Sequence, residues 1–226
     1  MGNFGGVVYG TGNWRCCMRN VVRLVFCLSC VGLFCFASPT EILKGRISAG
    51  NKRYAGFYEA LQLLSDRGAR VLVETGTARC GDLKFEEEGG STILFGDWAS
   101  QNGARLYSVD NCKAHLRLAK RGAGVYSGNI NYLCEDAVIF LKDFPLVIDF
   151  LYLDSGDFDI SNPEESQKYH LAELMAALPH FSSSTVVMID DCGLPHGGKG
   201  KLVIEYLISH GWRIVMHGYQ VILVAR

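Results

Sequence analysis

The chain has 226 residues, of which 20% are charged, and its formal net charge is −1 at pH 7. This length suits a single hydrophobic core, so we expect one domain of about 180 residues after an N-terminal extension. A nearly neutral chain without a run of Lys and Arg lacks the basic face that binds phosphate backbones. The sequence therefore favours a small-molecule acceptor substrate and excludes a nucleic acid as the expected partner.

Residues 1–50 form the predicted extension, which contains an apolar run from Leu24 to Ala37 behind three arginines. The pattern is typical of a signal peptide, but the run is shorter than the roughly 20 residues that comfortably cross a membrane. Three interpretations stay open: a cleaved signal, a membrane anchor acylated at Cys16 and Cys17, or an untranslated stretch. The four cysteines after residue 37 show neither disulfide nor zinc-ligand spacing, which is typical of a reducing compartment. We expect a cytoplasmic protein that residues 21–37 could attach to a membrane.

Helices and strands alternate along the rest of the chain. From Lys52 to Arg67, apolar residues recur at spacings of three and four, which predicts a helix that ends before Gly68. Short apolar, β-branched runs then predict seven strands, at 70–74, 104–110, 130–133, 148–154, 185–190, 213–216 and 221–225. Helical segments, among them 91–102 and 112–121, separate the first six. The last two strands are joined by only four residues, which forces an antiparallel hairpin.

This alternation predicts a doubly wound, Rossmann-like α/β fold, because parallel strands need helical crossovers between them. We expect a mostly parallel seven-stranded sheet over residues 51–226, with an antiparallel C-terminal hairpin and helices on both faces. Ligands of such sheets bind beyond the carboxyl ends of the strands, so the residues that end each strand are the candidates for function.

The first strand ends in Glu74 and opens into a turn that begins at Gly76. A carboxylate in this cleft would attract a cationic ligand and repel a pyrophosphate, which favours S-adenosylmethionine over NAD. Gly76 would let the backbone approach the amino-acid part of that ligand. The alternative stays open because Gly76-x-Ala78-x-x-Gly81 also fits a dinucleotide fingerprint, although Asp110 follows Gly81 by 29 residues where about 20 are usual.

Acidic residues end the next strands as well. Asp110 is placed to accept hydrogen bonds from both ribose hydroxyls, and Asp136 could accept one from the adenine amine. Single acids in these positions often only cap the following helix, but five consecutive strands that end this way indicate a ligand site.

Asp154, Asp190 and Asp191 end the fourth and fifth strands. If these strands are neighbours, three carboxylates converge, and a divalent cation such as Mg²⁺ would relieve their repulsion. The alternative is that Asp190 caps a turn and that Asp191 is solvated.

Two glycine-bearing loops complete the sequence patterns. Residues 193–199 match G-x-x-x-x-G-K, but Gly200 stands where a P-loop needs Ser or Thr, so we interpret them as a flexible rim that presents His196 and Lys199 to the substrate, or as an ordinary loop. The acidic run 86–88 is expected to be a solvated loop or a lid over the cleft.

Together these motifs resemble the class I S-adenosylmethionine-dependent methyltransferases, from about residue 54 to the C-terminus. The likeness is nearest to macrocin-type sugar O-methyltransferases and more remote to catechol O-methyltransferase. It rests on Val-Glu74-Thr-Gly76-Thr, Gly90-Ser-Thr, Ser-Val-Asp110-Asn, Glu-Asp136-Ala, Leu-Tyr-Leu-Asp154 and Met-Ile-Asp190-Asp191.

The resemblance implies two groups of site residues. Those expected to bind S-adenosylmethionine are Glu74, Gly76, Thr77, Gly81, Asp110, Asn111, Asp136 and Ala137. Those expected to hold Mg²⁺ are Asp154, Asp190 and Asp191, and the metal would bind two substrate hydroxyls and acidify one. The catechol-type lysine base is replaced by Asp157, so the candidate catalytic bases are Asp154 and His196.

We therefore expect an enzyme, a magnesium-dependent O-methyltransferase that acts on vicinal hydroxyls of a sugar or similar molecule. The alternatives are a metal-independent methyltransferase, an NAD-dependent oxidoreductase and a binding protein without catalysis.

Overall fold

The computed structural model describes residues 38–225, and these residues form one unit. The interpretations of residues 21–37 as a signal, an anchor or a membrane attachment lie outside the described residues, as do Cys16 and Cys17. Among the described residues, no helix is both long and apolar enough to cross a membrane.

A seven-stranded sheet in the order β3-β2-β1-β4-β5-β7-β6 forms the centre of this unit. The strands are β1 (Val71–Thr75), β2 (Arg105–Val109), β3 (Ile130–Leu133), β4 (Ile148–Leu153), β5 (Phe181–Ile189), β6 (Arg213–His217) and β7 (Val221–Val224). The first five pair in parallel, whereas β7 runs antiparallel to both β5 and β6. The predicted Rossmann-like sheet and its C-terminal hairpin are thereby confirmed.

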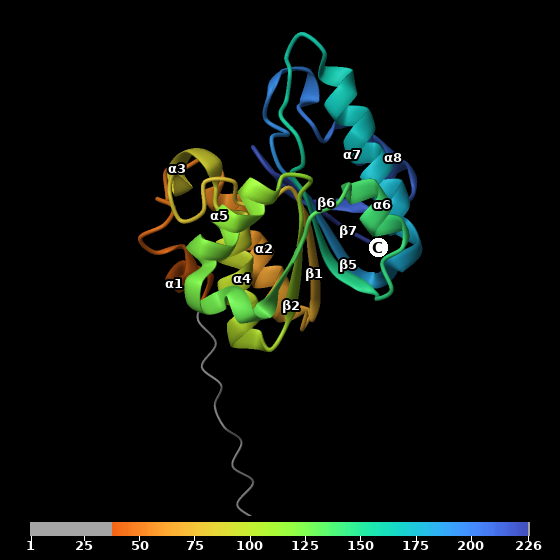
Figure 1. Cartoon of the computed structure of the whole chain (residues 1–226). Coiled ribbons are helices and arrows are strands. Elements are labelled where there is room, and N and C mark those ends of the chain that lie inside the picture. The colour runs from red at the N-terminus through yellow and green to blue at the C-terminus, as the bar shows by residue number, and fades with distance from the viewer. Residues whose placement is uncertain (1–37, 226) are drawn as a thin grey trace, which may run out of the picture. The chain divides into compact units, whose positions relative to one another are not determined.

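Helices connect the strands and cover both faces of the sheet (Figure 1). The α-helices are α1 (Pro39–Leu43), α2 (Tyr54–Asp66), α3 (Phe85–Glu88), α4 (Ser91–Asn102), α5 (Lys113–Ala123), α6 (Ala137–Lys142), α7 (Pro163–Ala177) and α8 (Lys201–Ser209). Short 3₁₀ turns are η1 (Gly124–Asn129), η2 (Leu178–His180) and η3 (Pro195–Gly197). As predicted, α4 ends at Gly103, which adopts a left-handed conformation with φ of 63°.

The period-two alternation of the strands separates two hydrophobic clusters, one on each face of the sheet. Leu72 of β1 points into the cluster formed with α1, α2 and α4, whereas the adjacent Val73 points into the cluster formed with α6, α7 and α8. Phe150 and Leu151 of β4 divide in the same way. From Leu72 in β1 and from Phe150 in β4, successive residues therefore face opposite sides of the sheet.

The core begins before residue 51. Ile42, Leu43 and Ile47 are buried against α2 and α4, and Arg46 forms an ion pair of 2.6 Å with Asp97 of α4. The hydrophobic core thus includes residues that the sequence pattern assigned to the N-terminal extension.

Candidate active site

A cavity of roughly 510 Å³ lies beyond the carboxyl ends of the first four strands. Seven residues that the sequence singled out line it: Gly76, Thr77, Asp110, Asn111, Asp136, Ala137 and Asp154. Five others do not: Glu74, Gly81, Asp190, Asp191 and His196. The volume is within the range of pockets that hold cofactors and small ligands.

Gly76 makes the floor of this cavity possible. Its φ is +81°, and a Cβ atom there would lie 2.4 Å from the carbonyl oxygen of Asp154. Its N–H donates to the carbonyl of Val109 at 2.9 Å, so the turn after β1 is held between β2 and β4. A side chain would both strain the backbone and push these strands apart.

Glu74 lies behind this turn and not in the cavity. It has the same parity as Leu72 and therefore points beneath α4, where it is fully buried. Ser108 donates to its Oε1 at 2.6 Å, and Thr92 donates to the same atom. Burial raises the pKa of Glu74 to about 7, although these hydroxyl groups oppose the shift. Glu74 was expected to face the ligand, but in the structure it supports the turn from behind.

The hydroxyls around Glu74 transmit that support to the cavity wall. Thr77 bonds to Ser108 at 2.8 Å, and Thr92 accepts the backbone N–H of Ala78 at 2.8 Å. Gly81, the last residue of the turn, packs against α5, because a Cβ there would meet the carbonyl of Leu118 at 2.8 Å. These residues shape the turn from behind.

Asp110 and Asp136 lie on the side of the cavity formed by β2 and β3. Asp110 accepts the N–H of Cys112 at 2.7 Å and faces His115 at 3.4 Å. Asp136 caps α6 and accepts the hydroxyl of Tyr169 at 2.7 Å, which lowers the pKa of Asp136 and keeps it ionised. Each carboxylate is thus held in place with acceptor capacity left toward the cavity.

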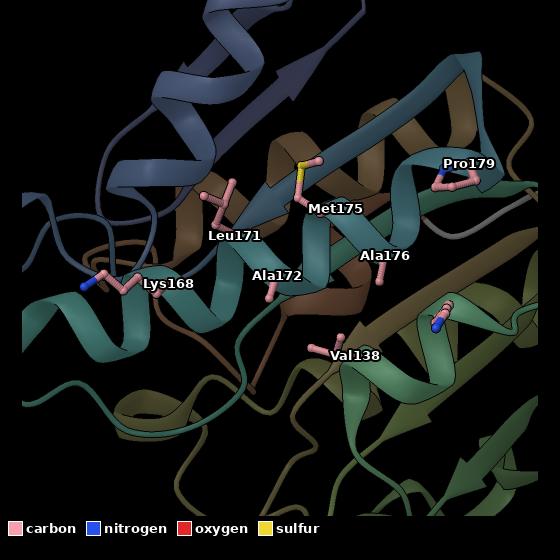
Figure 2. Close-up of a pocket in the computed structure, with 8 residues that line it drawn as sticks. Val138, Lys168, Leu171, Ala172, Met175, Ala176 and Pro179 are labelled. Atoms are coloured by element: carbon pink, nitrogen blue, oxygen red, sulfur yellow. The ribbon is translucent and has the colours of Figure 1, made fainter.

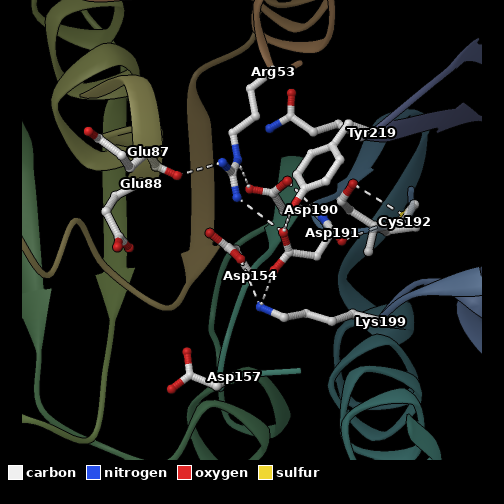
Figure 3. A network of polar contacts seen from close by, with 12 residues as sticks. Arg53, Glu87, Glu88, Asp154, Asp157, Asp190, Asp191, Cys192, Lys199 and Tyr219 are labelled. Atoms are coloured by element: carbon white, nitrogen blue, oxygen red, sulfur yellow. Dashed lines mark hydrogen bonds and ion pairs between the residues drawn. The ribbon is translucent and has the colours of Figure 1, made fainter. Parts of the chain in front are cut away.

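The three predicted metal ligands do converge, but two cationic side chains join them (Figure 3). Lys199 places its Nζ 3.1 Å from Asp154 Oδ1 and 3.0 Å from Asp191 Oδ2. Arg53 donates from Nε to Asp190 at 2.8 Å and from a terminal nitrogen to Asp191 at 3.1 Å.

Nearly every carboxylate oxygen of the cluster already has a partner. Asp190 Oδ1 accepts the N–H of Asp191 at 2.7 Å, and Asp190 Oδ2 accepts the hydroxyl of Tyr152 at 2.8 Å beside Arg53. Tyr219 donates to Asp191 Oδ1. Of the six carboxylate oxygens in this described cluster, Asp154 Oδ2 is the one without a protein partner. Those residues also include no group of three or more His, Cys, Asp or Glu side chains arranged to hold a metal ion. The donor set therefore does not fit Mg²⁺.

Burial and charge act on these groups in opposite directions. Burial raises the pKa of Asp154 above its ordinary value, and the nearby Asp190 and Asp191 add to the shift against the opposing charge of Lys199. Burial also acts to raise the pKa of Asp191, but Lys199, Tyr219 and Arg53 together lower it by more. The pKa of Asp191 therefore falls below its ordinary value. Of Asp154 and Asp191, Asp154 thus has the stronger tendency to take a proton.

Lys199 is buried because the loop that carries it is rich in glycine. Its side chain is only 3% exposed. Gly198 has φ of +56°, and a Cβ there would lie 1.8 Å from the carbonyl oxygen of Asp191. Gln167 of α7 donates to the carbonyl of Gly198 at 2.9 Å and to that of His196 at 3.2 Å. The sequence predicted a flexible rim, but this loop is fixed and delivers Lys199 to the carboxylates. The ring of His196 lies exposed outside the cavity.

Two residues of the site gave no local signal in the sequence. Arg53 ends a loop before α2 and reaches β5, 137 residues further along the chain. His170 of α7 lines the cavity and is fully buried. Its Nδ1 lies 2.8 Å from the carbonyl of Ser166, and its Nε2 has no partner among the described residues. Burial and then the charge of Lys199 lower the pKa of His170 to about 4, so the ring is neutral.

The acidic run 86–88 lies at the rim of the cavity and is not simply solvated. Glu86 accepts the N–H of Ser48 at 2.7 Å, and Glu88 pairs with Arg79 at 2.9 Å. Arg79 also pairs with Asp157 at 2.7 Å, and so joins this run to the loop after β4. The ion pairs extend across part of the cavity rim.

A second hollow, of about 600 Å³, lies between α6 and α7 (Figure 2). It is lined mainly by alkyl groups, from Val138, Lys142, Lys168, Leu171, Ala172, Met175, Ala176 and Pro179. None of these eight described lining residues carries a carboxylate.

No protein-family model matches this sequence, and no curated protein matches it. Solved structures do. An O-methyltransferase from Bacillus cereus in complex with S-adenosylhomocysteine has 16% identity and a TM-score of 0.54, over 84% of this chain and 90% of that one. A Podospora anserina methyltransferase bound to S-adenosylhomocysteine has 12% identity and a TM-score of 0.56, over 77% and 79%.

A third similar structure is the MycE methyltransferase of mycinamycin biosynthesis, in complex with Mg, S-adenosylhomocysteine and mycinamycin VI. It has 12% identity and a TM-score of 0.59, over 84% of this chain and 55% of that one. The chain therefore has the fold of these methyltransferases, with its cavity beyond the carboxyl ends of the same kind of parallel sheet.

Proposed function

We propose that the protein is an S-adenosylmethionine-dependent methyltransferase that modifies an oxygen of a small-molecule acceptor. The observation that carries the proposal is the cavity beyond β1 to β4, in which Gly76, Asp110 and Asp136 come from three successive strand ends. The fold shared with methyltransferases supports the same assignment.

The cofactor would lie across the first three strand ends. Asp110 would accept hydrogen bonds from the ribose hydroxyls, and Asp136 one from the adenine amine. The glycine at position 76 leaves room for the amino-acid moiety, because a Cβ atom there would fill the floor. Asn111 and Ala137, which follow the two acids in the cavity wall, would complete the contacts.

The substrate that accepts the methyl group would lie near Asp154, whose Oδ2 is free to accept a hydrogen bond. A bound S-adenosylmethionine would supply the electrophilic methyl group. Asp154 would take the proton of the substrate hydroxyl as the hydroxyl oxygen bonds to the methyl carbon. At the same time the bond between the methyl carbon and sulfur would break, and its electrons would stay on sulfur. The raised pKa of Asp154 suits a base for this step. Its main contribution would be to hold the oxygen in line.

The narrower expectation of a sugar or another vicinal diol as acceptor rests on the resemblance alone. The expectation of magnesium is opposed by the ion pairs around Asp190 and Asp191. We therefore assign no step of the reaction to a metal. The size of the cavity and its polar lining support the expectation of a small-molecule partner.

Calorimetric titration of S-adenosylhomocysteine into the full chain tests the cofactor, with NADH as the control ligand. We expect saturable binding of S-adenosylhomocysteine, and Asp110→Ala should weaken it by about tenfold or more because a charge-assisted hydrogen bond is lost. Asp143→Ala is the matched control, since Asp143 is exposed at the end of α6 and outside the cavity lining. Binding of NADH without S-adenosylhomocysteine would refute the proposal.

A further inference from the structure

The cluster of Asp154, Asp190 and Asp191 has its charge compensated by the chain itself. Two cations, Lys199 and Arg53, face three carboxylates at distances of 2.8 to 3.1 Å. Both cations are buried, with side chains 3% and 8% exposed. A buried charge of this kind persists only where its partners hold it in place.

We propose that Lys199, supported by Arg53, stands in the place of a divalent cation and lets this chain orient its acceptor without a metal. The cation part of this proposal rests on the geometry of the cluster. The part that concerns the acceptor rests on the proposed function.

The first argument is the position of the ammonium group. Nζ of Lys199 bridges one oxygen of Asp154 and one of Asp191, two of the three carboxylates that the sequence predicted as metal ligands. Mg²⁺ would need these oxygens at about 2.1 Å and several more in an octahedron. Asp190 cannot contribute them, because Arg53, Tyr152 and a backbone N–H occupy its two oxygens.

The second argument is that the lysine cannot move aside. A long side chain usually reaches solvent when a stronger cation displaces it. Here Gly198 brings the backbone against the carbonyl of Asp191, and a Cβ at Gly200 would lie 2.4 Å from the sulfur of Cys192. Gln167 holds the same loop from α7. The loop therefore fixes the ammonium among the carboxylates, and a metal beside it would meet both repulsion and a filled space.

The third argument is what the arrangement leaves open. Lys199 binds Oδ1 of Asp154 and so sets the orientation of that carboxylate in the cavity wall. Oδ2 is then the atom that an acceptor hydroxyl would meet. Lys199 is in this sense a positioning residue, because it acts on the acceptor through Asp154.

Binding of Mn²⁺ to the full chain, followed by electron paramagnetic resonance, tests the cation part without any turnover. We expect no bound Mn²⁺ in the wild type. Lys199→Met removes the charge and frees two carboxylate oxygens, so this variant should show a signal of bound Mn²⁺ that the wild type lacks. Lys201→Met is the matched control, since Lys201 is exposed two residues further along and should leave the result unchanged.

Circular dichroism establishes that each variant is folded, and Lys199→Gln replaces Lys199→Met if that variant is not. Stoichiometric Mn²⁺ binding by the wild type would overturn the proposal, and so would a folded Lys199 variant that binds none. Affinity for S-adenosylhomocysteine in EDTA is measured in parallel. Its absence would refute the proposed function and leave the manganese result to judge the cation, so the two failures are distinguishable.

Discussion

Glu173 gives a quantitative test of how burial behind the candidate site shifts the pKa of a carboxyl group. This residue of α7 is fully buried, and the hydroxyls of Ser155 and Thr75 act on its carboxyl group. Burial raises the pKa of Glu173 from 4.5 to about 8, and the two hydroxyls oppose the shift only in part. The folded protein therefore keeps Glu173 protonated over a range in which the unfolded chain has ionised it.

The sign and size of the effect follow from this difference. Between pH 4.5 and pH 8 the folded state binds the additional proton, so rising pH destabilises the fold by up to about 1.4 kcal/mol per pH unit. Glu173→Gln has nearly the same shape and does not titrate. We expect the variant to gain on the wild type by about 3 kcal/mol in free energy of unfolding between pH 5 and pH 8.

Urea unfolding of the full chain, followed by tryptophan fluorescence at a series of pH values, measures this gain. Glu165→Gln is the control, because Glu165 is exposed on the same helix and its replacement should give a difference that does not grow with pH. A constant difference between Glu173→Gln and the wild type from pH 5 to pH 8 would show that Glu173 is ionised in the folded protein, and it would refute the argument.

Two further predictions concern the site itself. Gly198→Ala should lower the free energy of unfolding by about 2 kcal/mol or more, because its Cβ would collide with the carbonyl of Asp191. Gly128→Ala is the control, since a Cβ at Gly128 meets no atom within 4 Å. Equal melting temperatures of the two variants would contradict this prediction. His170 has a lowered pKa of about 4, so the unfolded chain binds the extra proton between pH 4 and pH 6.5, and stability falls as the pH drops through that range. His170→Gln should reduce this acid loss by about 3 kcal/mol in urea unfolding at pH 4, and an unchanged loss would assign it to other groups.

The fold could be predicted because its signals are local. The predicted strands are short apolar runs, α2 shows the apolar spacing of a helix, and the loop of three residues before β7 permits only a hairpin. The strand ends followed from the same pattern, and this is why Asp110, Asp136 and Asp154 were found in the cavity wall. Such features depend on residues within a few positions of one another.

Side-chain direction and long-range pairing were harder to predict. Glu74 was expected in the cleft, but the alternation that sends Leu72 toward α4 sends Glu74 the same way, so the pattern held the information. Arg53 is different, because its partner Asp190 is 137 residues away and nothing near either residue indicates the pair. Acidic strand ends alone therefore indicated a metal, whereas the fold supplies cations from elsewhere in the chain.

Because the compensating cations come from distant parts of the chain, the candidate site forms only together with the fold. A metal site can be emptied and refilled while the fold persists. Here the cations are part of the chain, because Arg53 comes from the loop before α2 and Lys199 from the loop before α8. They meet the carboxylates only when both loops are folded against β4 and β5. Removal of either cation would leave a buried carboxylate without its partner, which costs more than the pair itself contributes. The charge balance of the candidate site and the stability of the fold are in this way maintained by the same two cations.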